Sequence, residues 1–79
     1  MTISLHSPEY RQFVSSLVEI RKAAGVTQSE LARRLDKPQS YVSKVERYER
    51  RLDPAEFDAM ARALGSDPVA AFKSVSEGR

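Results

Sequence analysis

Apolar residues recur every three or four positions along nearly the whole chain. No stretch shows the alternation of apolar and polar residues that marks a half-buried strand. This pattern predicts an all-α fold. The first helix is expected to begin after Ser7, whose hydroxyl can cap the first turn, with Pro8 at the first helical position, and to stop at Gly25. Its apolar positions are Tyr10, Phe13, Val14, Leu17, Val18 and Ile20.

Two short helices are expected next, over about residues 28–35 and about residues 39–47. Thr27, followed three residues later by Glu30, predicts a capping box at the start of the first. The turn 36–38 begins with Asp, which tolerates left-handed backbone, and ends with Pro, which sets the start of the second helix. Two short helices joined by a tight turn are the layout of a helix-turn-helix, whose second helix lies in the DNA major groove.

Two Asp-Pro pairs predict the later helices. Asp53-Pro54 begins a fourth helix that stops at Gly65, and Asp67-Pro68 begins a short fifth. The apolar positions of the third and fourth helices are expected to face one core, and they are Val42, Val45, Phe57, Met60, Ala61 and Leu64.

The 79 residues suffice for one domain with a small core, and they include no cysteine, which excludes disulfides, thiol catalysis and thiolate metal sites. The domain is expected over residues 8–75, between a flexible arm at 1–7 and a frayed end at 76–79. The chain has no leader-like segment and no apolar run near the roughly 20 residues of a membrane span. We therefore expect a soluble, cytoplasmic protein.

The net charge is only +2, but it is unevenly distributed. Residues 21–51 carry nine Lys or Arg and four Asp or Glu, whereas the segments before and after them are net negative. The basic excess therefore lies over the predicted helix-turn-helix, where contact with DNA phosphates needs it. The alternative interpretation is a solvated basic face without a partner.

Two motifs at a fixed distance point to a family. A Thr-Gln-x-x-Leu-Ala segment at 27–32 is followed by an apolar-Ser-basic-apolar-Glu segment at 42–46. With Arg21, Gly25, Ser40 and the Ala-Arg-Ala-Leu-Gly run at 61–65, they make the chain resemble the Cro/repressor-type (XRE, lambda-repressor-like) helix-turn-helix regulators. The resemblance covers about Leu17 to Phe72 and implies a compact five-helix domain that binds pseudo-palindromic DNA as a homodimer.

The sequence departs from this family at two positions. The family usually has Gly in the turn where this chain has Asp36, and Gly at the end of the recognition helix where it has Tyr48. A tyrosine at positive φ costs roughly 1–2 kcal/mol. We therefore expect the recognition helix to continue past Tyr48, or the 47–52 loop to take another path.

Four side chains are the candidates for reading bases, and they are Gln39, Ser40, Tyr41 and Lys44. The Gln39 amide can donate and accept together, which matches adenine N6 and N7, and Lys44 can donate to guanine O6 and N7. Ser40 can reach a base edge or a phosphate. Tyr41 can pack against a thymine methyl, but an equally good interpretation makes it a partly buried spacer against the preceding helix. For Gln39 and Lys44 the alternative is a solvent-facing side chain.

The candidates for phosphate contact are Gln28, Lys37, Ser43, Arg47, Arg50 and Arg51. The arginines follow the recognition helix and would supply affinity and salt dependence but no sequence code. The family resemblance implies that Gln28 bonds a backbone phosphate and braces the first recognition residue. The N-terminus of its helix also offers N–H groups to that phosphate.

The resemblance also implies an ion pair between Arg21 and Glu46 that fixes the angle of the recognition helix. His6 is the only histidine and there is no cysteine, so neither a metal site nor a Ser/His/Asp arrangement is expected. No glycine-rich loop is present to hold a nucleotide. We expect neither an enzyme nor a cofactor.

We thus predict a sequence-specific, double-stranded DNA-binding transcription regulator that acts as a homodimer on an inverted repeat. The expected dimer surface is apolar and C-terminal, and comprises Leu64, Val69, Phe72 and Val75, although these residues could instead close the monomer core. An antitoxin or a restriction–modification controller would have the same fold. A protein-interaction module without DNA binding is the alternative from another class.

Overall fold

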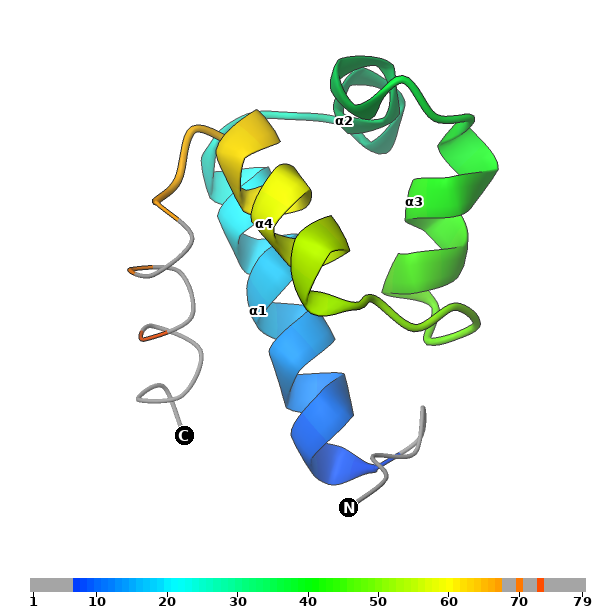
Figure 1. Cartoon of the computed structure of the whole chain (residues 1–79), viewed down its shortest axis with the longest axis vertical. Helices are drawn as coiled ribbons and strands as arrows, with labels where there is room; N and C mark the ends of the chain where they lie inside the picture. Colours follow the sequence, from blue (N-terminus) through cyan, green and yellow to red (C-terminus); the bar gives the residue numbers. More distant parts are fainter. Residues whose placement is uncertain (1–6, 68–69, 71–72, 74–79) are drawn as a thin grey trace.

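The computed structural model describes residues 7–67, 70 and 73, and all regular secondary structure within them is helical (Figure 1). Its helices are α1 (Pro8–Ala23), α2 (Gln28–Leu35), α3 (Gln39–Glu46) and α4 (Pro54–Ala63). The all-α class is confirmed. The expected fifth helix falls largely outside the described residues, of which only Ala70 and Lys73 lie there, and both are helical.

The apolar positions predicted from periodicity meet in one core. Val14, Leu31, Val42 and Val45 are the largest fully buried side chains. Three of these, Leu31, Val42 and Val45, belong to a cluster of buried residues from every helix and from the loops around residues 26 and 52. The other members of the cluster are Leu17, Val26, Ala32, Leu52, Met60 and Leu64. Phe13 and Phe57 pack against this cluster with ring centroids 5.3 Å apart and join α1 to α4. Leu64 therefore belongs to the core of the chain, which is the alternative considered for it, while Val69, Phe72 and Val75 lie outside the described residues.

The helix starts follow the sequence with one exception. The Ser7 hydroxyl accepts a hydrogen bond from Tyr10 N, and the Asp53 carboxylate accepts one from Glu56 N, while Glu56 bonds back to Asp53 N. Thr27 Oγ1 likewise accepts from Glu30 N at 3.0 Å.

The reciprocal half of the capping box predicted at Thr27 does not form. The Glu30 carboxylate instead accepts hydrogen bonds from Arg33 and Arg34, one turn further along the same helix. These bonds, from Arg33 first and then Arg34, lower the pKa of Glu30 to about 2. The two arginines outcompete one backbone N–H because they offer several charged donors.

Every helix in the described part of the chain ends in the same left-handed turn. The residues at positive φ are Gly25 (72°), Asp36 (56°), Tyr48 (63°) and Gly65 (78°). After α3, Tyr48 N donates to Val45 O at 3.1 Å and Glu49 N donates to Lys44 O at 2.8 Å, which is the Schellman pattern of helix termination. The left-handed Asp36 confirms the turn predicted between α2 and α3.

The expectation that the chain avoids positive φ at Tyr48 is wrong. Its side chain explains why the conformation is tolerated: Tyr48 Oη lies 3.1 Å from Ser15 Oγ, and the Arg11 guanidinium lies over the ring at 4.8 Å from its centroid. Both partners are on α1. A hydrogen bond and a cation–π contact are each of the order of 1 kcal/mol, enough to offset a left-handed tyrosine.

A second tyrosine holds the other end of the same loop. Leu52 N donates to Tyr10 Oη at 3.1 Å, and Tyr10 Oη donates to Arg50 O at 3.5 Å. The 47–52 loop is therefore attached to α1 at two places. These attachments fix the end of α3 relative to α1, the longest helix.

We predict that Tyr48→Val lowers the free energy of unfolding by about 1–2 kcal/mol more than Tyr48→Gly does, because a β-branched residue tolerates left-handed backbone least. Both variants lose the contacts with Ser15 and Arg11, so their difference isolates the backbone conformation. Urea unfolding measures it. Equal losses would show that Tyr48 does not retain this conformation in solution.

Candidate nucleic-acid interface

The unit formed by α2, the turn and α3 is held together by close packing and by the turn itself. Leu31 and Ala32 of α2 are buried against Val42 and Val45 of α3, and the small Ala32 lets the two helices approach. Lys37 N closes the turn by donating to Ala32 O at 2.9 Å. Each helix supplies one buried face, so the opposite face of α3 is left outside.

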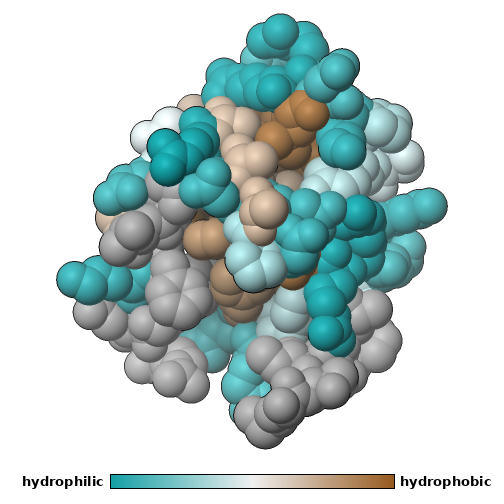
Figure 2. All heavy atoms as spheres, viewed as in Figure 1, coloured by the Kyte–Doolittle hydropathy of each residue, from teal (hydrophilic) through white to brown (hydrophobic). Residues whose placement is uncertain are grey.

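The outer face of α3 is polar. Gln39 and Ser40 in its first turn and Lys44 one turn later are exposed, whereas Ser43 is half-buried. Hydrophilic residues also dominate the molecular surface around α2 and α3 (Figure 2). Three of the four predicted base-reading residues therefore lie together on a surface that can enter a groove.

A chain of four side chains runs from the core to this surface. Arg21, 8 % exposed, donates from Nε to Glu46 Oε2 at 2.6 Å and from Nη2 to Glu46 Oε1 at 3.0 Å, and its Nη1 donates to Val26 O at 2.8 Å. Gln28 Nε2 donates to the same Glu46 Oε1 at 2.8 Å. Gln39 Nε2 then donates to Gln28 Oε1 at 3.5 Å.

This chain contains the ion pair and the brace that the family resemblance implies. The Arg21–Glu46 pair links the ends of α1 and α3, and Gln28 at the start of α2 touches both Glu46 and Gln39. The contact between Gln28 and Glu46 was not predicted, since nothing in the spacing of these residues indicates it.

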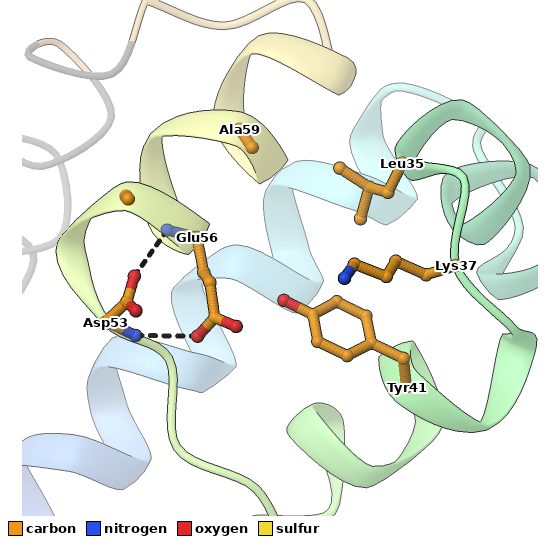
Figure 3. Close-up of a pocket in the computed structure, with 7 residues that line it drawn as sticks. Leu35, Lys37, Tyr41, Asp53, Glu56 and Ala59 are labelled. Carbon is orange, nitrogen blue, oxygen red and sulfur yellow. Dashed lines mark hydrogen bonds between the residues drawn. The ribbon is translucent and has the colours of Figure 1, made fainter.

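Tyr41 does not lie on the polar face. Its hydroxyl points toward α4 (Figure 3), and two cations lie near its ring, with Lys37 Nζ at 5.5 Å and the Arg50 guanidinium at 4.6 Å from the centroid. Burial, and then the charge of Glu56, raise the pKa of its hydroxyl above the ordinary value. Tyr41 is thus a spacer, as the alternative interpretation held, but it packs toward α4 and not only against α2.

A small cavity lies beside Tyr41, between the turn and the start of α4. Its volume is about 200 Å³, and it is lined by Leu35, Lys37, Tyr41, Asp53, Ala55, Glu56 and Ala59 (Figure 3). Its two carboxylates are already engaged, because Asp53 and Glu56 form the capping box of α4 and Glu56 pairs with Arg50. The Lys37 ammonium, which contacts the Tyr41 ring, is the remaining charged group of the lining.

The arginines of the 47–52 loop differ in their availability to DNA. Arg50 Nη2 lies 2.8 Å from Glu56 Oε2, and this hydrogen bond, followed by that from Asp53 N, lowers the pKa of Glu56. Arg50 is thus used within the chain, and this arrangement does not support its expected role at a phosphate. Arg47 makes only an exposed pair with Glu49 at 3.3 Å, and Arg51 and Lys37 are also exposed.

Arg34 has a structural function that the sequence did not reveal. Its Nη1 donates to Ala63 O at 2.8 Å and satisfies a carbonyl at the end of α4.

Among the described residues, no three His, Cys, Asp or Glu side chains are placed to hold a metal ion. No helix among them is long and apolar enough to cross a membrane.

Known proteins share this helix-turn-helix. A family model described as Helix-turn-helix matches residues 17–70. The structure of an XRE-family like protein from Pseudomonas syringae pv. tomato str. DC3000 is 46 % identical, with a TM-score of 0.86 over 92 % of this chain and 89 % of that one. A search of curated proteins returned no significant match.

Two more distant structures share the fold. A mutant of the restriction–modification controller protein C.Esp1396I is 22 % identical, with a TM-score of 0.83 over 91 % of each chain. The clp gene regulator ClgR from Corynebacterium glutamicum is 21 % identical, with a TM-score of 0.78 over 91 % of this chain and 77 % of that one.

We predict that Arg21→Met lowers the free energy of unfolding by about 3 kcal/mol, because it leaves the Glu46 carboxylate buried without its counter-charge. The double variant Arg21→Met/Glu46→Leu should regain most of that loss. Arg62→Met, which breaks the exposed pair with Asp58, is the control and should cost less than about 1 kcal/mol in urea unfolding. An Arg21→Met loss no larger than that of the control would contradict a stabilising buried pair.

Proposed function

This chain belongs to the XRE-type helix-turn-helix family of DNA-binding regulators, and we propose that it is a sequence-specific transcription regulator that binds an inverted-repeat operator as a homodimer. The observation that carries the proposal is the division of α3 into two faces. Val42 and Val45 hold one face in the core, while Gln39, Ser40 and Lys44 project from the other. An α-helix presented in this way fits the major groove.

Each exposed residue has a role in this account. Gln39 reads adenine through N6 and N7, Ser40 contacts a base edge or the adjacent phosphate, and Lys44 donates to guanine or to phosphate. Lys37 precedes α3 and Arg47 and Arg51 follow it, and these exposed cations supply salt-dependent phosphate contacts. Ser43 has a smaller part because it is half-buried.

The homodimer follows from the size of the reading unit. One α3 of eight residues reaches few base pairs, so a single module binds weakly and with little discrimination. Two modules on half-sites about 34 Å apart raise affinity and specificity together. We place the dimer contact at the C-terminal apolar residues Val69, Phe72 and Val75, without Leu64.

The polarity of the outer face argues against a protein-interaction module. Binding faces for proteins concentrate their energy in apolar or aromatic anchors. The exposed side chains of α3 are instead an amide, a hydroxyl and an amine, and the one aromatic residue of that helix, Tyr41, is turned toward α4.

Selection of binding sites from a random duplex library tests the proposed function. We expect an enriched inverted repeat whose half-sites are centred about one helical turn apart. Binding should weaken steeply with salt on every duplex, but the ratio of selected to random sites should persist. A library without any enriched sequence would overturn sequence-specific binding, and an enriched single half-site would overturn the homodimer.

We predict that Gln39→Ala relaxes the preference at one base pair in each half-site and costs about 1–3 kcal/mol on the selected operator. Affinity for random duplex should hardly change, because no phosphate contact is removed. Competition titrations with the four bases at each position measure the preference. If Gln39→Ala weakens selected and random duplexes equally, Gln39 does not read a base.

A further inference from the structure

The hydrogen bonds that link Arg21 to Gln39 converge on Glu46, which accepts from Arg21 on one side and from Gln28 on the other. The Arg21 guanidinium has only donors and the Glu46 carboxylate has only acceptors. The Gln28 atom that lies 2.8 Å from Glu46 Oε1 must therefore be the amide nitrogen, since an amide oxygen there would face a carboxylate oxygen. The other amide atom, Gln28 Oε1, is left facing Gln39.

The orientation of Gln28 in turn fixes that of Gln39. Because Gln28 presents an oxygen, Gln39 turns its nitrogen toward Gln28, with 3.5 Å between the two atoms. One of the two Gln39 N–H groups is used in this contact. The second N–H and the carbonyl oxygen stay available at the exposed start of α3, as one donor beside one acceptor.

A donor beside an acceptor suits one base in the major groove. Adenine offers the N7 acceptor next to the N6 donor, whereas guanine offers two acceptors, O6 and N7. If Gln28 were reversed, Gln39 would turn its oxygen toward the Gln28 amide and its NH₂ group, with two donors, away from it. The same residue would then suit guanine.

We propose that Glu46, which does not reach the outer face, is a positioning residue that sets base specificity by fixing the polarity of the Gln28 and Gln39 amides. The buried Arg21 holds the Glu46 carboxylate in place through two hydrogen bonds. Reversal of Gln28 would place two oxygens at hydrogen-bonding distance in a largely buried site, where an unpaired acceptor is unfavourable. This inference rests on the proposed base reading by Gln39.

We call the contacts from Glu46 through Gln28 to Gln39 the relay. A double-mutant cycle on the full chain tests whether Glu46 acts on Gln39 through it. The variants are Glu46→Gln, Gln28→Met and the double variant, each checked for its fold by circular dichroism. The readout is the ratio of affinities for adenine and guanine at the base pair whose preference depends on Gln39. The wild-type ratio should be on the order of tenfold. Glu46→Gln should reduce it severalfold, but should change nothing further in the Gln28→Met background, because the relay is already broken there.

A second variant tests polarity without touching the buried pair. Gln28→Lys still donates to Glu46 but offers only donors to Gln39, so the preference should move from adenine toward guanine. Any added phosphate affinity of the lysine acts equally on both duplexes and leaves their ratio unchanged. If Glu46→Gln does not fold, Gln28→Lys alone decides whether the orientation of the amides sets the base preference.

Two results would overturn the relay: an unchanged ratio in both Glu46→Gln and Gln28→Lys, or an equal reduction by Glu46→Gln in the presence and absence of Gln28. Neither can be confused with a failure of the proposed function. That failure appears in the wild-type protein, as the absence of any base pair whose preference depends on Gln39.

Discussion

A buried ion pair between Arg21 and Glu46 joins the last turn of α1 to the last turn of α3, and the placement of α3 depends on it. Arg21 also bonds the carbonyl of Val26 in the loop before α2, and Glu46 also accepts from Gln28 at the start of α2. Three helices therefore meet at two charged side chains that are nearly excluded from water. A small apolar core specifies packing only loosely, whereas a buried, fully bonded pair is satisfied in one arrangement.

The two ends of α3 are fixed by a different means. A left-handed non-glycine residue lies just before it, at Asp36, and another just after it, at Tyr48. Such residues are unfavourable by themselves and persist where the surroundings hold them. Tyr48 is held by Ser15 and Arg11 of α1, and the loop beyond it is held by Tyr10. In this account, the helix that reads DNA begins and ends at positions set by the rest of the domain.

Features set by neighbours in sequence could be predicted. The Ser7 and Asp53 caps, the stop at Gly25, the left-handed Asp36 and the inward Val42 and Val45 all follow from local backbone preferences and helical spacing. Features decided by distant contacts could not. Tyr48 adopts positive φ with partners 33 and more residues away, and Tyr41 turns to α4, with Arg50 of the loop over its ring. Glu30 is a local exception, because Arg33 and Arg34 of the next turn compete for its carboxylate. The ion pair was accessible only through the family resemblance, since no local signal couples residues 25 positions apart.

A structure of the full chain bound to its selected operator measures the central claim most directly. The account predicts α3 in the major groove of each half-site, with the Gln39 oxygen and nitrogen within hydrogen-bonding distance of adenine N6 and N7, and Gln28 still donating to Glu46. A complex in which the outer face of α3 points away from the bases, or in which Gln39 contacts only phosphate, would contradict it.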